Sequence, residues 1–543
     1  MTDDCGFLSD LSLAADQLSF EPAARDEFAA DFGTPPDAER APDAVVWPET
    51  TADVSAVLAA ANERGVPVTP YAAGSGMQRN AVPTQGGITL AMTRMDAVRD
   101  LRPRDMQVDV EPGVVGDDLN DLVAEKGLFF PAFPQSAAFS TIGGMIATDA
   151  SGIRTVKYGE VGDWVLQLEV VRPDGSVTEV GSKARKTSAG YNLVDLFVGS
   201  EGTLGVVTRA TLDLAATPPE TVGGRAIFPT LEDATAAITD VVTSGVDVAT
   251  IELVDPLTAD IANAYTGSEL PATPMVFFEV HGRSIDAEID ALEAAFRARD
   301  VTRIEHSADD EEMAELWRAR REIGHALKEW DSDLDLEVIG DVTVPIGSYP
   351  AIVEFIGEIR AEYDFPIPAF GHAGDGNTHY AVLCDRDDPE AVERAHEASG
   401  RIIDEAIALG GTCTGEHGVG VGRIGAIVEY VELALEDAIA VDGWLACNTD
   451  ANGGGLGFGT SAGVEQERKL TEEGCDLLRC DGRRWRRGVG SCRGVETEVL
   501  AEGDQPVTQR DCGGGVEFDD SFGVVVHSWS LTPPPAGQTN HRP

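Results

Sequence analysis

The stretch YNLVDLFVGSEGTLGVVT (191–208) runs from an apolar segment through a turn of small residues into a strand that we predict over 203–214. Two more clusters of small residues, AAGSG (72–76) and STIGG (140–144), occur in the same N-terminal region. Small residues let backbone N–H groups approach a ligand closely, and successive N–H groups form cradles for anions. One such turn is usually only a turn, but three in one domain predict a cofactor that carries phosphate.

Two common phosphate-binding motifs do not explain these clusters. The chain contains no GxxxxGK[ST] sequence, which excludes a P-loop NTPase. The nearest match to a dinucleotide fingerprint, GVGRIG (420–425), follows a predicted loop rather than a strand and comes late in the chain. The predicted cofactor site is therefore not of the Rossmann type.

Hydrophobic periodicity divides most of the chain into two α+β domains, 41–218 and 219–422, after a helical lead-in over 1–40. The Pro218-Pro219 pair marks the boundary between them. The first domain shows a strand–helix–strand pattern over 45–69 and a hairpin over 164–180. The second alternates strands with helices predicted over 230–244, 284–298, 309–328, 348–363 and 389–409. It ends in two predicted loops, GHAGDGNTHY (371–380) and GGTCTGEHGVGVG (410–422).

Charge, hydropathy and the N-terminal segment argue against several classes of protein. The 543 residues include 94 acidic and 40 basic side chains, a formal charge of −54, which disfavours a nucleic-acid surface. No apolar stretch approaches the ~20 residues that cross a bilayer. The acidic start MTDDCGFLSD lacks the basic region of a secretory signal. We expect a cytoplasmic protein, at most peripheral at the inner face of the membrane.

The acidic bias also favours a protein that works in molar salt, as in haloarchaea. Only six residues are lysine, and the acidic residues are spread over whole domains. Repulsion among so many like charges destabilises a compact state at low ionic strength. At 1 M salt the Debye length is about 3 Å, so this repulsion is screened. An acidic cytosolic protein with no salt requirement is the alternative.

Histidines gather in the two predicted glycine-rich loops. None of the nine precedes His281, yet His372, His379 and His417 lie there beside Asp375, Asn377 and Glu416. Imidazole and carboxylate together suit a divalent first-row metal such as zinc. Loop histidines that only hydrogen-bond to the backbone are the alternative.

A basic cluster stands out in so acidic a chain, and it comprises Arg318, Arg320, Arg321 and Lys328. The cluster could form i,i+4 ion pairs along a helix. Alternatively, one arginine binds a substrate carboxylate through two parallel hydrogen bonds.

In combination, these motifs resemble flavoproteins of the vanillyl-alcohol oxidase type, in the branch of D-lactate dehydrogenases and glycolate oxidase FAD subunits. The resemblance covers about residues 40–422 and is specific as a joint pattern. The segments that carry it follow in family order: AVVWPET (44–50), PYAAGSGM (70–77), STIGGMIATDASG (140–152), 191–208, LWRARRE (316–322), DVTVP (341–345), GHAGDGNTH (371–379) and GEHGVGVG (415–422).

The resemblance implies an α+β fold with a two-part FAD-binding domain (41–218) and a ferredoxin-like cap domain (219–422). No His or Cys lies between Gly6 and Val280, so we expect FAD to be held noncovalently. The resemblance implies that FAD is bound by Pro70, Gly74, Ser75, Gly76, Pro134, Ser136, Ser140, Thr141, Gly143, Gly144, Gly152, Glu201, Gly202, Thr203, Gly205 and Val207.

The resemblance also implies a divalent metal, zinc or manganese, on His372, His379 and Glu416. His417 is then the base that takes the 2-hydroxyl proton while the C2 hydride passes to the flavin, since imidazole is a suitable base near neutral pH. Arg320 would hold the substrate carboxylate, and Asn377 completes the expected catalytic set.

The expected function is oxidation of a small 2-hydroxy acid, D-lactate or glycolate, with electrons leaving to a cytochrome, a quinone or a soluble carrier. Ile339 and Gly340 replace a lysine that some relatives carry, which argues against a dicarboxylate substrate. A catalytically weak FAD-binding subunit of a glycolate oxidase-like complex is the alternative. A secreted carbohydrate oxidase with covalent flavin is disfavoured by the lack of His and Cys in the first domain.

Residues 423–543 have a different composition. Five of the eight cysteines lie here, together with glycine runs and the basic segment RRWRR (483–487). The change favours a tail that is out of frame or foreign, and a small domain is the alternative. We expect this segment to be poorly ordered and to contribute nothing to catalysis.

Overall fold

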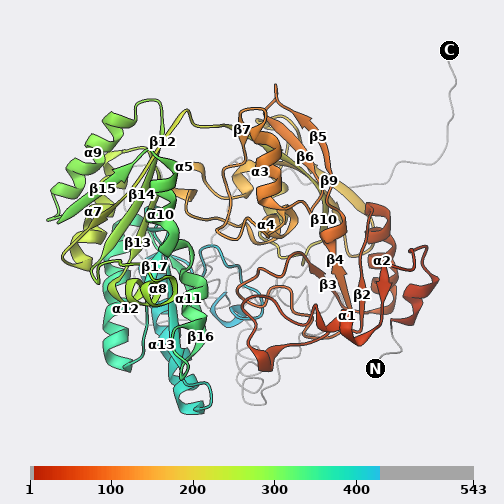
Figure 1. Ribbon diagram of the computed structural model, residues 1–543. Coiled ribbons are helices and arrows are strands. Elements are labelled where there is room, and N and C mark those ends of the chain that lie inside the picture. Colours follow the sequence, from red (N-terminus) through yellow and green to blue (C-terminus); the bar gives the residue numbers. More distant parts are fainter. Residues whose placement is uncertain (1–4, 428–543) are drawn as a thin grey trace, which may run out of the picture. The chain divides into compact units, whose positions relative to one another are not determined.

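The computed structural model describes residues 5–427, and the expected tail lies almost wholly outside this range. Within it, the N-terminal half forms a four-stranded sheet, a five-stranded sheet and one separate pair of short strands, and the C-terminal half forms one larger sheet (Figure 1). The mixed composition of helices and sheets agrees with the predicted α+β class.

The first sheet has the strand order β1-β2-β4-β3. Its strands are β1 (Leu18–Ser19), β2 (Ala44–Val46), β3 (Val68–Tyr71) and β4 (Ile88–Ala91). β4 pairs in parallel with both β2 and β3, and helix α2 (Thr51–Arg64) supplies the crossover between them. Thr50 and Asp53 close a capping box at the start of α2, and Gly65 ends it in the left-handed conformation. In its described residues, the lead-in contains the short helix α1 (Pro22–Asp26), two 3-10 helices (Gly6–Asp10 and Pro36–Ala38) and the edge strand β1.

The second sheet is antiparallel, with the order β5-β6-β10-β8-β9. Its strands are β5 (Val98–Arg102), β6 (Gln107–Val110), β8 (Val165–Val171), β9 (Val177–Gly181) and β10 (Val206–Asp213), and β7 (Leu128–Phe129) pairs separately with β11 (Ala215–Ala216). The predicted hairpin over 164–180 is β8 and β9. The helices of this part are α3 (Gly116–Ala124), α4 (Ile142–Thr148), α5 (Thr155–Tyr158) and α6 (Val194–Phe197).

The third sheet has seven antiparallel strands in the order β15-β12-β14-β13-β17-β18-β16. They are β12 (Glu220–Ile227), β13 (Val248–Val254), β14 (Met275–Gly282), β15 (Arg303–Ser307), β16 (Asp335–Thr343), β17 (Ala369–Gly371) and β18 (Asn377–Cys384). Val276, Phe278 and Val280 of β14 belong to one apolar core, whereas Met275 and Phe277 belong to another. This alternation buries both faces of the sheet.

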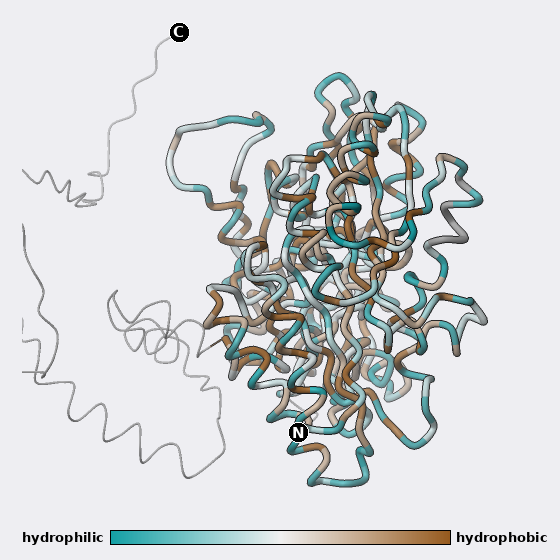
Figure 2. Tube along the Cα trace, turned by 90° about the vertical axis from the view of Figure 1, so that its left-hand side faces the viewer, coloured by the Kyte–Doolittle hydropathy of each residue, from teal (hydrophilic) through white to brown (hydrophobic). Residues whose placement is uncertain are grey.

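Helices cover both faces of this sheet. The first core packs against α7 (Leu231–Ser244), α9 (Ile285–Arg297), α12 (Tyr349–Tyr363) and α13 (Pro389–Ala408). The second packs against α8 (Pro256–Thr266), α10 (Asp310–Arg321) and α11 (Ile323–Glu329). In Figure 2 the apolar stretches follow strands and helices, and hydrophilic segments are concentrated in the outer turns.

Two predicted elements of the cap domain differ in the structure. The helix expected over 309–328 is interrupted at Glu322, whose ψ of 1° is not helical, just before Gly324, a residue that weakens helices. The loop expected over 371–380 gives way at Asn377 to the buried strand β18. The first three residues of β18, NTH, are polar, and for this reason the sequence pattern predicts a loop there. Its remaining residues, YAVLC, are apolar except for a tyrosine hydroxyl.

We expect folding stability to depend on salt. The thermal midpoint should rise as KCl increases from dilute to molar, because screening relieves repulsion within a chain of charge −54. Sucrose at matched osmolality is the control, since it stabilises folded proteins without screening charge. A midpoint that is flat across the KCl series would contradict the prediction.

Candidate active site

A cavity of about 370 Å³ is lined by both the N-terminal domain and the cap domain. All the residues predicted to bind FAD line it, except Gly152 and Thr203. Gly152 packs against the backbone of Phe133, and the Thr203 hydroxyl donates to the Ser200 carbonyl to close its own turn. The three small-residue clusters, far apart in sequence, thus form one wall of one cavity.

Serine hydroxyls connect two of these clusters. The Ser140 hydroxyl lies 3.0 Å from Ser75 Oγ and 2.6 Å from Ser136 Oγ. Close packing requires glycine at Gly143, where an added Cβ would lie 2.4 Å from Pro112 Cβ. Gly202 has φ +74°, and a Cβ there would lie 2.8 Å from Pro70 Cγ. Glycine is therefore required at both positions for the close packing of the loops that line the cavity.

The opposite wall carries a cluster of histidine and glutamate side chains. His372 follows β17, His379 lies on β18, and Glu416 and His417 lie in the turn after α13. Glu416 Oε1 lies 3.1 Å from the Nε2 atoms of both His372 and His379. The rings of His379 and His417 stack with centroids 5.0 Å apart. All four predicted residues therefore converge on the cavity.

Glu252 of β13 is a site residue that the sequence analysis missed. Its side chain is fully buried, with Oε1 2.6 Å from His372 Nδ1 and Oε2 accepting from Arg320 Nε at 3.1 Å. Burial alone would lower the pKa of His372, but Glu252 and Glu416 raise it well above the usual value. The signal in the sequence was one acidic residue inside the apolar run TIELV (250–254).

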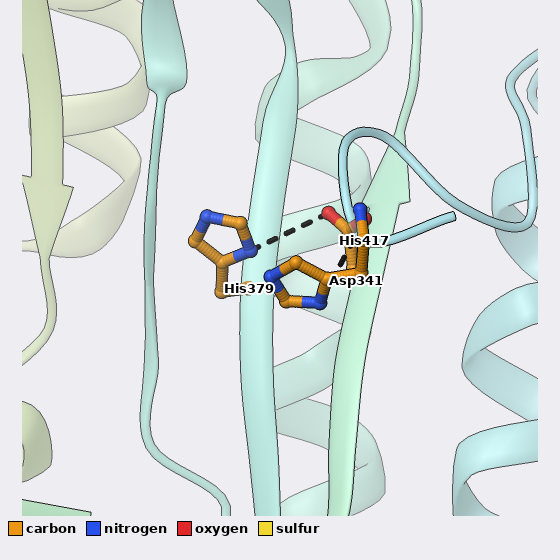
Figure 3. A group of neighbouring side chains, drawn as sticks. All are labelled: Asp341, His379 and His417. Carbon is orange, nitrogen blue, oxygen red and sulfur yellow. Dashed lines mark hydrogen bonds and ion pairs between the residues drawn. The ribbon is translucent and has the colours of Figure 1, made fainter. Parts of the chain in front are cut away.

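Asp341 of β16 is the second missed residue, although its DVTVP segment carried the family resemblance. Its Oδ2 accepts from the backbone N–H groups of Gly415, Glu416 and His417 at 2.8, 2.8 and 3.0 Å. Its Oδ1 lies 3.4 Å from His379 Nδ1 (Figure 3). Burial alone would raise the pKa of this carboxyl, but the imidazoles of His417 and His379 hold it well below its usual range. Asp341 thus fixes both a strand histidine and the turn.

His417 is oriented by the same aspartate, with Nδ1 3.9 Å from Asp341 Oδ2 (Figure 3). Burial lowers the pKa of His417 below the usual value, although the carboxylates of Asp341 and Glu416 act in the opposite direction. Asn377, predicted as catalytic, is not among the residues that line the cavity. Its Nδ2 donates to Asp341 Oδ1 at 2.6 Å and to the Val342 carbonyl, which places it behind the cluster.

Arg320 is buried in the cavity wall, 3% exposed. Its Nε and Nη2 donate to Glu252, Nη1 donates to Gln135 Oε1 at 3.3 Å, and its guanidinium lies over the Phe370 ring. The edge formed by Nε and Nη2 is therefore occupied by a protein carboxylate. The Nη1 atom is directed at Gln135 of the N-terminal domain.

Two sequence models of protein families match the chain. One describes an FAD binding domain and matches residues 42–181. The other describes the C-terminal domain of FAD linked oxidases and matches residues 217–438, so it extends into the segment that begins at 423. No described helix is long and apolar enough to span a bilayer.

Relatives cover most of the chain. It is 36% identical to a probable mitochondrial D-lactate dehydrogenase of Danio rerio, over 73% of this chain and 80% of that protein. It is 34% identical to the glycolate oxidase subunit GlcD of Bacillus subtilis (strain 168), over 75% and 86%. A solved structure of p-cresol methylhydroxylase with bound substrate matches with a TM-score of 0.65 at 18% identity, over 80% and 94% of the two chains.

The p-cresol methylhydroxylase match confirms the predicted vanillyl-alcohol oxidase type of fold, and the family match confirms FAD as the cofactor. The two relatives match 73% and 75% of the chain, which is more than either predicted domain alone. The chain therefore belongs to the family of FAD-linked oxidases and is an FAD-dependent oxidoreductase.

Proposed function

We propose that the protein is a 2-hydroxyacid dehydrogenase that oxidises D-lactate or glycolate to the 2-oxo acid and passes electrons to a cytochrome, a quinone or a soluble carrier. One observation carries the proposal: His372, His379, Glu416 and His417 line the same cavity as the FAD-binding loops. The names of the relatives, D-lactate dehydrogenase and a glycolate oxidase subunit, support this substrate class.

The donor set supports a divalent metal, zinc or manganese, on His372, His379 and Glu416. One ligand atom from each lies within 4.8 Å of the others, and the two N···O distances are 3.1 Å. Bond lengths of about 2.0–2.1 Å in a tetrahedral zinc site require ligand atoms about 3.3 Å apart, which is close to this spacing. Glu252 and Asp341 face the outer ring nitrogens, as carboxylates commonly do behind metal-binding histidines.

In this proposal, side chains of the cavity bind the substrate and take its proton. When bound, FAD supplies the hydride acceptor and the divalent ion supplies a Lewis acid that makes a hydroxyl more acidic. His417, as a neutral imidazole, takes the hydroxyl proton of the substrate as C2 loses its hydride, which leaves the 2-oxo acid. The Nη side of Arg320 holds the substrate carboxylate, and Glu252 fixes the orientation of that guanidinium.

FAD is held noncovalently in this proposal. The histidines that line the cavity, from His325 to His417, all come from the cap domain, and its described lining contains no cysteine. Acid precipitation should therefore release the yellow colour into the supernatant. Colour that stays with the pellet after denaturation would indicate a covalent bond.

Bleaching of the flavin tests the substrate class. Under anaerobic conditions the flavin absorbance should fall with D-lactate or glycolate, and L-lactate serves as the stereochemical control. D-2-hydroxyglutarate should bleach poorly, because Ile339 lines the cavity at the position where some relatives are expected to carry a lysine. A flavin that none of these acids reduces would refute the proposal and favour the catalytically weak subunit.

A further inference from the structure

Glu201 lies in the N-terminal domain, and its carboxylate accepts hydrogen bonds from backbone N–H groups of the cap domain. It lies in the SEGTLG turn that lines the FAD cavity, and its φ of 49° is unusual for a residue other than glycine. Its carboxylate accepts from the N–H of Val419 at 2.5 Å and from the N–H of Gly420 at 2.9 Å. The side chain predicted to serve FAD is therefore directed at the turn that carries Glu416 and His417.

The receiving turn is shaped to accept this carboxylate. Gly418 has φ +75°, and a Cβ there would lie 2.4 Å from Glu201 Oε1. Asn80, also from the N-terminal domain, donates from Nδ2 to the His417 carbonyl at 3.2 Å. In Figure 1 the blue segment after α13 lies between the cap domain and the N-terminal domain.

Two carboxylates from different domains thus hold one turn. Asp341 of the cap domain takes the N–H groups of residues 415–417, and Glu201 takes those of 419 and 420. Removal of either carboxylate leaves backbone donors of this half-buried turn without their partner, which costs free energy. Asp341 alone cannot fix the second half of the turn, because its acceptors are directed at the first half.

We propose that Glu201 is a positioning residue for catalysis, which holds the turn of Glu416 and His417 in register with the FAD-binding loops. Its carboxylate acts through the backbone of residues 419 and 420. The kinetic consequence rests on the proposed function, whereas the structural consequence does not.

The test compares Glu201→Gln with Glu179→Gln, an exposed glutamate of β9 that pairs with Arg209. Hydrogen–deuterium exchange should accelerate in peptides that cover 415–422 in Glu201→Gln and should be unchanged in Glu179→Gln. Turnover at saturating FAD and divalent ion should fall about 10- to 100-fold, as for other residues that orient metal-ligand segments. The FAD content of both variants should match that of the original protein.

Exchange in 415–422 that is unchanged in Glu201→Gln, with loss of FAD, would overturn the proposal and make Glu201 a cofactor residue only. If Glu201→Gln does not accumulate, Glu201→Asp gives the same test. It keeps the charge but shortens the side chain, which withdraws the carboxylate from the N–H groups of Val419 and Gly420. Faster exchange in 415–422 supports the proposal, and unchanged exchange there contradicts it. Failure of all substrates to bleach the flavin would refute the proposed function and leave the exchange result interpretable.

Discussion

His417→Ala should retain FAD and a divalent ion but lose turnover by about 10²- to 10⁴-fold, the usual contribution of a positioned general base. His417 is not in the proposed ligand set, and its backbone N–H to Asp341 survives the substitution. The rate of flavin reduction in anaerobic stopped-flow, measured with D-lactate and glycolate, is the readout.

His396→Ala is the matched control, because this exposed histidine of α13 pairs with Glu337 and is not among the residues that line the cavity. It should reduce its flavin at the original rate. Added imidazole should restore part of the rate in His417→Ala only, since the substitution leaves space for it beside Asp341. A flavin reduction rate in His417→Ala equal to that of the control would show that another group accepts the proton.

His372→Ala should lose the divalent ion and activity together while FAD remains. The substitution removes one of three proposed ligands and also leaves the buried Glu252 with Arg320 as its remaining partner. Metal analysis after gel filtration, together with the flavin absorbance and turnover, separates these effects. His396→Ala is again the control.

Chelation provides the complementary experiment on the unsubstituted protein. Exhaustive dialysis against a chelator should abolish turnover, and Zn²⁺ or Mn²⁺ should restore it, whereas His372→Ala should not respond to either ion. Full activity after chelation would refute the metal, and the histidines would then contact the substrate directly.

Local patterns sufficed for the fold class and for most of the residues that line the large cavity. The helices over 230–244, 284–298, 348–363 and 389–409 were predicted within about one residue at each end, because each has an apolar face at helical spacing. The three small-residue clusters were recognised because glycine and serine are needed wherever the backbone approaches a ligand. Such requirements act on neighbouring residues and are therefore visible in the sequence.

Contacts between side chains that are far apart in the sequence could not be predicted from it. Glu252 and Asp341 lie inside strands, where an acidic residue gives no indication of its partners, and those partners are up to 120 residues away. Asn377 could not be distinguished from a catalytic amide by its motif, because only the sheet shows that it lies behind Asp341.

The sequence by itself determined the cofactor class and the residues of the histidine cluster, because both depend on residue types at short spacing. Only the tertiary structure decided which side chains orient that cluster. A buried carboxylate is stable when hydrogen-bond donors from several elements surround it. Only the folded chain brings together β13, β16, the turn that contains Glu201 and the turn over 415–420.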